Sequence, residues 1–275
     1  MQEQKKSKRH TSWNRVGRWY DKSVGDKGHH YHQTVVLPGL LALLALDKTE
    51  QPRLLDAACG QGMLARALPK HVVYHGVDAA PSLIQSAKER TKRPDASFAI
   101  ADLTETLPVA KRSFSHAVIC LALQNIEQGE AAIRNVVDCL EEGGQLVLVL
   151  NHPCYRIPRQ THWGTDQGSA TQYRRVDRYM NALAIPIQTH PGQGSRSQET
   201  WSFHHPLSDY TRWLRAAGCM IEDIQEWCSD KVSTGKAAKM ENRARSEIPL
   251  FMAISCRKCP KWNFCHRGTE DTETV

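Results

Sequence analysis

The chain lacks a long hydrophobic run. Its longest apolar stretch, Val35 to Leu46, is interrupted by Pro38 and Gly39 and is shorter than the roughly 20 residues that a membrane-spanning helix needs. The first thirty residues also lack an apolar segment typical of secretory signals, and they hold eight lysines and arginines against three acids. We therefore expect a cytoplasmic protein without a membrane partner, whose nine cysteines are reduced.

The chain shows no internal repeat and no obvious second domain. Its 275 residues, 24% of them charged, suit a single globular core. The formal net charge of +7 slightly favours an anionic partner. We divide the chain into a basic N-terminal arm (1–30) with a short helix over 13–20, a folded domain (31–255) and a cysteine-containing tail (256–275).

Strands and helices are expected to alternate through the folded domain. The pattern predicts strands over 54–57, 72–77, 97–101, 114–121 and 145–150, and helices over 37–46, 63–68, 81–91 and 131–140, the last ended by Gly143 and Gly144. A helix over 207–217 and strands over 221–227 and 249–255 follow. Such near-continuous apolar strands are typical of an α/β fold with a parallel sheet covered on both faces, where ligands bind at the carboxyl ends of the strands.

Acidic residues end three successive strands: Asp56, Asp78 and Asp102. The first precedes Gly60 and Gly62, whose loop lets the backbone approach a ligand closely. The loop fits a loose dinucleotide motif, but a carboxylate at this point would repel a pyrophosphate. S-adenosylmethionine carries an ammonium and a sulfonium and no phosphate, and an acid on the second strand can bind a ribose.

The order of these motifs resembles the class I S-adenosylmethionine-dependent methyltransferases, most of all the type 11-like family. The matching segments are "DAACGQG" from Asp56, "GVDAAPSLIQSAKER", "FAIADLTETLP", "FSHAVICLALQNIE" and "LEEGGQLVLVLN". In the first, Ala58 replaces the usual glycine. The resemblance implies a Rossmann-like fold over 31–255, with a seven-stranded mostly parallel sheet whose last strand is antiparallel, and an insertion after strand five (152–206).

The resemblance also implies which residues bind S-adenosylmethionine. They are Asp56, Ala58, Gly60, Gly62, Asp78, Ala79, Asp102, Leu103, Leu121 and Asn125. Each acid has a simpler interpretation, since Asp56 and Asp78 can cap the helices that follow and Asp102 can belong to a turn. Asn125 can equally close a loop.

Asn151 and His152 follow strand five and are expected near the transferring methyl group. His152 is either a base or substrate clamp, or a loop histidine bonded to backbone. The chain shows no N-P-P-Y motif of the kind found in adenine-N6 methylating enzymes. Neither Cys120 nor Cys154 stands in the Pro-Cys context of a cytosine-C5 nucleophile at the expected strand.

The insertion holds six arginines and no lysine, and guanidinium groups suit carboxylates and phosphates. Its candidate substrate residues are Tyr155, Arg156, Tyr173, Arg175, Tyr179 and His204. The segment "TQYRRVDRYM" is interpreted as a helix that lies over the site as a lid. The segment before the first motif is expected to cover the opposite side of the site, through Tyr20, His29, His30, Tyr31 and His32. For the insertion, the alternative is a solvated surface whose charged side chains pair with one another.

The tail holds Cys256, Cys259, Cys265 and His266 at the spacing of a small zinc knuckle. Cys256 is expected within the last strand, and the loop between Cys259 and Cys265 is short. The histidines of the N-terminal segment lack an acid at ligand spacing. We therefore assign no metal site.

Three functions remain open from the sequence. The first is in-line methyl transfer to a small acidic or aromatic metabolite, which the arginine-rich insertion favours. The second is methylation of RNA, such as tRNA, docked through the basic arm and a loop with Lys231, Lys236, Lys239, Arg243 and Arg245. The third is cofactor binding without turnover, which only Ala58 suggests.

Overall fold

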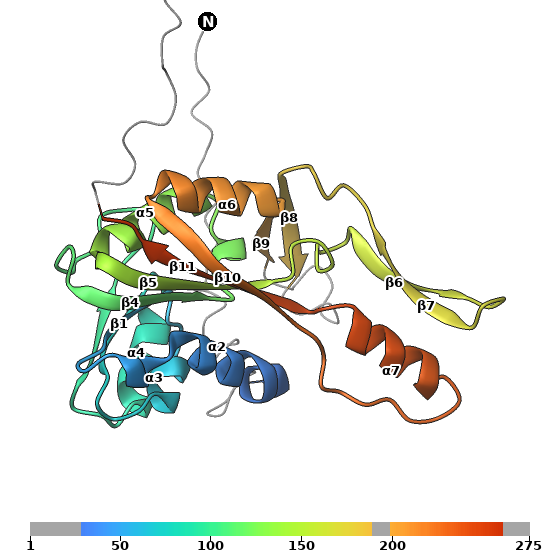
Figure 1. Ribbon diagram of the computed structural model, residues 1–275, viewed down its shortest axis with the longest axis horizontal. Coiled ribbons are helices and arrows are strands. Elements are labelled where there is room, and N and C mark those ends of the chain that lie inside the picture. Colours follow the sequence, from blue (N-terminus) through green and yellow to red (C-terminus); the bar gives the residue numbers. More distant parts are fainter. Residues whose placement is uncertain (1–28, 189–198, 261–275) are drawn as a thin grey trace, which may run out of the picture.

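A seven-stranded sheet with helices on both faces forms the centre of the computed structural model, which describes residues 29–188 and 199–260 (Figure 1). The strand order is β10-β11-β5-β4-β1-β2-β3. Only β11 runs antiparallel to its neighbours, which confirms the expected mostly parallel class I fold. The strands are β1 (Arg53–Ala57), β2 (Val73–Asp78), β3 (Ala96–Ile100), β4 (Phe114–Cys120), β5 (Leu140–Asn151), β10 (Cys219–Trp227) and β11 (Phe251–Lys258).

The central strands are buried on both faces, as their unbroken apolar sequences require. In β4 every residue but the last is buried, and β5 is buried from Gln145 to Leu150. One face is covered by α5 (Gly129–Cys139) and α6 (Leu207–Ala216), and the other by α2 (Leu37–Leu44) and α3 (Met63–Ala67). A π-helical turn, η1 (His32–Val36), precedes α2, and η2 (Leu46–Lys48) follows it. Helix α4 (Pro81–Arg90) packs on β2 and β3.

The helix expected to end at Gly143 and Gly144 ends earlier, at Cys139. Leu140 is already extended and pairs with Phe114 of β4. Gly143 has a φ of 77°, which glycine adopts without a steric penalty. The two glycines therefore shape the start of a long β5 instead of ending the helix.

The insertion after β5 consists of two β-hairpins, so the prediction of a helix over "TQYRRVDRYM" is wrong. The first hairpin pairs β6 (Thr161–Asp166) with β7 (Thr171–Val176), and the second pairs β8 (Leu183–Gln188) with β9 (Glu199–His204). Strand pairing across a Gly-Ser turn outweighs the helical spacing of apolar residues, because Thr and Val favour extended backbone. Met180 lies beyond the strand and is exposed.

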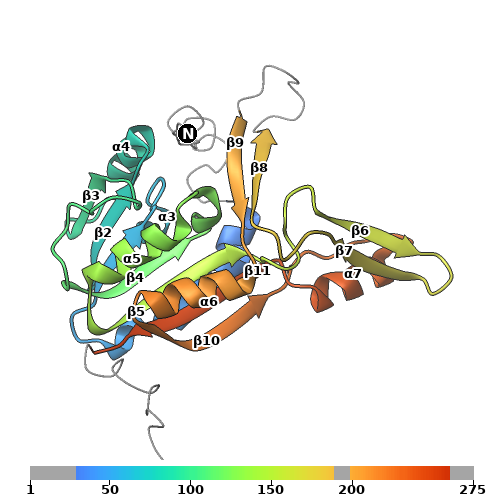
Figure 2. The ribbon, with the colours of Figure 1, turned by 90° about the horizontal axis from the view of Figure 1, so that it is seen from above.

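The first hairpin projects from the end of the sheet beside α7 (Ala238–Glu247) (Figures 1 and 2). The hairpin and the helix form a small layer of their own. The segment predicted as a basic loop is therefore partly helical, since α7 includes Lys239, Arg243 and Arg245. The second hairpin instead packs against η3 (Leu123–Asn125), the turn that follows β4.

Some predictions concern residues outside the described ranges, namely the basic arm with its helix over 13–20, and Cys265 and His266 of the tail. Cys256 is fully buried in β11, and its thiol donates to the Leu146 carbonyl at 3.5 Å. Within 29–188 and 199–260, no group of three metal-binding side chains is present. None of the helices in these ranges has the length and apolar character to cross a bilayer.

Candidate functional site

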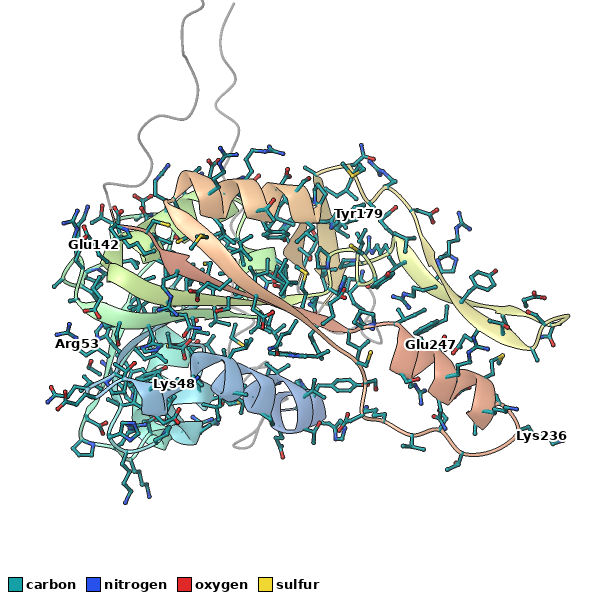
Figure 3. All side chains as sticks on the ribbon, in the orientation of Figure 1. Lys48, Arg53, Glu142, Tyr179, Lys236 and Glu247 are labelled. Atoms are coloured by element: carbon teal, nitrogen blue, oxygen red, sulfur yellow. The ribbon has the colours of Figure 1, made fainter. Side chains whose placement is uncertain are left out.

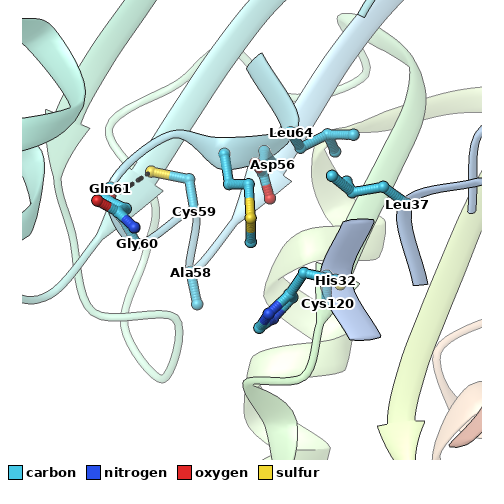
Figure 4. Close-up of a pocket in the computed structure, with 10 residues that line it drawn as sticks. His32, Leu37, Asp56, Ala58, Cys59, Gly60, Gln61, Leu64 and Cys120 are labelled. Carbon is cyan, nitrogen blue, oxygen red and sulfur yellow. Dashed lines mark hydrogen bonds between the residues drawn. The ribbon is translucent and has the colours of Figure 1, made fainter. Parts of the chain in front are cut away.

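A cavity opens at the carboxyl end of β1 (Figure 4). It is bounded on one side by the loop after β1 and on the other by the start of η1 and the end of β4. Its lining residues are His32, Leu37, Asp56, Ala58, Cys59, Gly60, Gln61, Met63, Leu64 and Cys120. The topology of the sheet therefore brings together three chain segments that are far apart in sequence.

Asp56 forms the acidic part of this cavity. It is 3% exposed, and the Tyr74 hydroxyl donates a 2.7 Å hydrogen bond to its Oδ2. Burial raises the pKa of Asp56 to about 7, the Tyr74 hydrogen bond opposes this rise, and Asp78 adds to it. A cation bound in the cavity would favour the ionised carboxylate.

The loop after β1 has three residues in the left-handed region: Ala58 (φ 64°), Gly60 (φ 56°) and Gly62 (φ 73°). A Cβ on Gly60 would meet no atom within 4 Å, so its absence leaves open space against the backbone. The Cys59 amide donates to the Val77 carbonyl at 2.9 Å, which ties the loop to β2. The loop thus presents bare backbone to a ligand.

Ala58 has backbone strain that a glycine would not have. A non-glycine residue in the left-handed region costs about 1–2 kcal/mol, partly offset because glycine loses more entropy on folding. We expect Ala58→Gly to raise the free energy of unfolding by up to about 1 kcal/mol, measured by denaturant titration. A loss of stability would show that the Ala58 methyl group packs favourably.

Asp78 holds the same loop from β2. Its Oδ2 accepts the Gly60 amide at 2.9 Å, and its Oδ1 accepts the Ala80 amide at 2.8 Å. Burial raises the pKa of Asp78, while these two backbone hydrogen bonds oppose the rise. Neighbouring Ala79 is exposed. The carboxylate therefore stabilises the loop and the start of α4, as the capping interpretation required, and it lies at the strand end where a ribose is expected.

The remaining predicted cofactor residues follow β3 and β4 at the same edge of the sheet. Asp102 is exposed, and its Oδ1 accepts the Thr104 amide at 2.9 Å, as in a turn. Leu103 is buried in the core. Leu121 has a φ of 52°, and Asn125 is half-buried at the end of η3. Their assignment as cofactor residues stays a prediction.

The donor set of this edge fits S-adenosylmethionine. A buried acid matches a ligand with positive charge, and the Gly60 backbone leaves room for close approach. The acid at the end of β2 lies where acids bind ribose hydroxyls in related folds. Among the described residues, no cluster of basic side chains, which a phosphate-rich ligand would need, lines the cavity.

His152 is buried and held at both ring nitrogens. Its Nε2 donates to Glu226 Oε1 at 2.6 Å, and its Nδ1 accepts the Cys154 amide at 3.2 Å. Burial lowers the pKa of His152, against the effect of Glu226. This matches a loop histidine that joins the end of β5 to β10. Asn151 is exposed at the end of β5, and the catalytic role of both residues stays a prediction.

The predicted substrate residues separate into two groups. Tyr179 and His204 lie together at the start of α6, where the Leu207 amide donates to the Tyr179 hydroxyl at 3.0 Å and His204 Nε2 bonds the Tyr179 carbonyl at 2.7 Å. Tyr173 and Arg175 lie on the projecting hairpin, with Arg175 paired to Asp177. Figure 3 shows Tyr179 near α6, well apart from Lys236 at the tip beside α7.

Tyr155 and Arg156 lie in the turn after β5, where both amides donate to the His152 carbonyl. The Tyr155 ring packs against the His152 ring with the centroids 4.8 Å apart and the planes tilted by 40°, and the Tyr155 carbonyl accepts a hydrogen bond from Arg174. Burial lowers the pKa of Arg156. Burial also lowers the pKa of Arg174, and the nearby positive charge of Arg156 lowers it further. No acid within the described residues forms an ion pair with Arg156.

Sequence reasoning missed Tyr74. Tyr74 reads as an ordinary strand residue, and only the pairing of β1 with β2 brings its hydroxyl to Asp56.

Residues 55–148 match the model of a methyltransferase domain family. A curated relative, the ubiquinone biosynthesis O-methyltransferase of Coxiella burnetii, is 25% identical over 173 residues, which is 62% of this chain and 64% of that protein. The chain thus spans less than two thirds of that relative's length.

Solved structures agree on the fold. An S-adenosylmethionine-dependent methyltransferase from Mesorhizobium loti superposes with a TM-score of 0.63 and 24% identity, covering 85% of this chain and all of that one. A protein from Listeria monocytogenes described in the same terms has a TM-score of 0.61 and 20% identity, covering 84% and 98% of the two chains.

Proposed function

We propose that this chain, whose residues 55–148 match a methyltransferase domain family, methylates a small acidic or aromatic metabolite by in-line displacement with S-adenosylmethionine as the donor. The observation that carries this proposal is the cavity at Asp56, which is lined by the loop after β1, by His32 of η1 and by Cys120 at the end of β4. The relative named for O-methylation in ubiquinone biosynthesis points the same way.

The protein's own residues need to bind and orient the cofactor and the substrate more than to activate them. S-adenosylmethionine, when bound, supplies a methyl group on an already activated sulfonium, so the rate depends mainly on alignment of the acceptor. Asp56 would neutralise the cationic end of the cofactor, Asp78 would face its ribose and the Gly60 backbone would allow close contact. Arg156, which lacks an ion-pair partner within the described residues, would bind an acidic group of the substrate.

Methylation of RNA is the second candidate, and the ion pairs on α7 are evidence against it. Arg243 pairs with Glu247 at 2.9 Å, and Arg245 pairs with Glu241 at 3.6 Å. Because these acids neutralise the arginines, α7 presents less free positive charge than its sequence suggests, and phosphate contacts need free positive charge. The basic arm lies outside the described residues.

A methyl-labelling experiment separates the two candidates. The protein is incubated with S-adenosylmethionine carrying a radiolabelled methyl group and a cell extract divided into RNA, protein and small-molecule fractions. We expect label in the small-molecule fraction, and much less label with an Asp56→Asn variant as control. Label confined to ribonuclease-sensitive material would contradict the metabolite proposal.

A further inference from the structure

Two arginines of the insertion lie close together beyond the end of β5. Arg156 belongs to the turn after β5, and Arg174 lies in β7. The Arg174 Nε donates at 3.0 Å to the carbonyl of Tyr155, the residue directly before Arg156. Burial lowers the pKa of Arg174 and the positive charge of Arg156 lowers it further, as expected for like charges at short range. The fold therefore brings two guanidinium groups to one place.

Within residues 29–188 and 199–260, no acid compensates these two charges. The charges that act on Arg156 and Arg174 include no carboxylate. Glu226, the acid that reaches this turn, is bound instead to His152 at 2.6 Å. Like charges that share a partly desolvated place cost free energy unless an opposite charge joins them. The pair is therefore an incomplete ionic cluster that a bound anion would complete.

The two guanidinium groups differ in how firmly they are held. Arg174 donates from Nε to Tyr155 and from Nη2 to Thr161 Oγ1 at 2.7 Å, and its Cζ lies 5.2 Å from the Trp163 ring centroid. These contacts fix its plane and use two of the five N–H donors of a guanidinium. Arg156 makes no hydrogen bond through its side chain to the described residues and is exposed. Both groups therefore keep donors for a ligand that arrives from solvent.

Tyr31 links this pair of arginines to the cavity. Burial lowers the pKa of Arg156 and the nearby Tyr31 hydroxyl opposes the shift. That hydroxyl shares a 2.9 Å hydrogen bond with Ser229 Oγ, and Lys231 Nζ lies 4.9 Å from the Tyr31 ring centroid. The next residue in the chain, His32, lines the cavity. The two arginines therefore lie beside the segment that borders the candidate cofactor site, in a region of positive charge.

We propose that Arg156 and Arg174 form a binding site for a dianionic group, a phosphate monoester or a dicarboxylate, and that the methyl-accepting substrate carries this group. The second part rests on the proposed function. Guanidinium groups bind carboxylate and phosphate oxygens in a bidentate manner. Two uncompensated charges favour a dianion, since a single carboxylate would leave one of them unpaired. A phosphodiester, as in RNA, carries only one negative charge per phosphate and fits this site less well.

The first test measures anion binding and needs no substrate. Inorganic phosphate, malonate and acetate are titrated into the full-length protein by calorimetry at pH 8 and constant ionic strength. Arg156→Gln removes one charge of the pair, and Arg174→Lys keeps the charge but removes the planar fork. Arg53→Gln is the matched control, because Arg53 pairs with Glu141 at 3.1 Å and lies far from the projecting hairpin (Figure 3). The Tm of each protein without added anion shows whether the fold is retained.

We expect phosphate and malonate to bind the wild type with a Kd on the order of 1 mM, and acetate to bind at least about tenfold more weakly. Arg156→Gln should weaken both dianions at least about tenfold, and Arg53→Gln less than about twofold. Arg174→Lys should lie between these two variants, since a lysine keeps the charge without the fork. The Tm of Arg156→Gln should rise, because repulsion between the two arginines is removed.

The second test identifies the dianion that the substrate carries. The low-molecular-mass filtrate of a cell extract is labelled with radiolabelled S-adenosylmethionine, with and without earlier treatment by alkaline phosphatase. Loss of labelling after this treatment indicates a phosphate monoester, and unchanged labelling indicates a dicarboxylate. In either case Arg156→Gln should lower the labelling rate of the dilute filtrate at least about tenfold relative to Arg53→Gln.

Two results would overturn the inference. One is acetate binding as tight as that of phosphate and malonate, and the other is equal dianion binding by Arg156→Gln and Arg53→Gln. Failure of the proposed function gives a different result. The wild type would then label RNA and not the filtrate, while phosphate and malonate binding would still depend on Arg156.

Discussion

Asp56→Asn is expected to weaken S-adenosylmethionine binding at pH 8 by about ten- to a hundredfold, the equivalent of one hydrogen bond to a charged group. The buried carboxylate lines the cavity and is the charged group there best placed to face a cationic ligand. The asparagine keeps the shape and can still accept the Tyr74 hydroxyl. Isothermal titration of the cofactor measures the loss.

The same residue predicts a pH dependence of cofactor binding. The pKa of Asp56 is about 7 in the free protein, so a cation that favours the ionised form binds better as pH rises through 7. From pH 6 to pH 8 the ionised fraction increases about tenfold, and the affinity should follow it. Asp56→Asn should show no such change over this range, and an equal pH response in both proteins would contradict the assignment.

The stability of the free protein should change with pH in the opposite direction to cofactor binding. A carboxyl group whose pKa is higher in the folded than in the unfolded state binds more protons when folded, so its contribution to stability falls between about pH 4 and pH 7. We therefore expect Asp56→Asn to be more stable than the wild type at pH 8 and not at pH 4. Tyr74→Phe should shift the binding transition to higher pH, because the hydroxyl that stabilises the carboxylate is lost.

The second large effect is expected for Asp78→Ala. Its carboxylate accepts two backbone amides, those of Gly60 and Ala80. Removing it leaves both amides without that partner and costs about 3 kcal/mol of unfolding free energy, or a fall in Tm of roughly 6–12 °C. The loop after β1 should also lose its fixed conformation, so cofactor binding should weaken strongly.

A thermal shift with and without S-adenosylmethionine measures both effects at once. The sequence alone suggested that Asp78 binds ribose, whereas the two amide bonds imply that it also stabilises the fold. A variant that keeps the wild-type Tm and loses only cofactor binding would show that ligand contact is its main role. Asp95→Ala is a suitable control, since Asp95 pairs with Arg93 away from the cavity.

The insertion shows most clearly where a local sequence pattern fails to predict the secondary structure. The spacing of Tyr173, Val176 and Met180 suits a helical face, but Thr171–Val176 pairs instead with Thr161–Asp166. This pairing leaves Tyr173 half exposed and places Arg175 on the projecting hairpin. Helical periodicity within one segment says nothing about a partner strand ten residues away, and that partner decides the structure.

The sequence by itself determined the α/β architecture and the edge of the sheet that holds the candidate site. Runs such as "LVLVL" are buried central strands because only buried strands are apolar on both faces. Asp56, Asp78 and the Gly60 loop follow such runs directly, so their place at the carboxyl edge depends on chain order alone. The local sequence pattern and the chain order were sufficient to predict these features.

The tertiary structure alone decided which side chains meet. Tyr74 reaches Asp56 because β1 and β2 are neighbours in register. His32 reaches the cavity because η1 packs at the end of β4, and His152 is held by Glu226 from a strand 74 residues away. These contacts join distant segments whose proximity depends on how the whole sheet and its covering helices pack, and no spacing within a short stretch encodes it.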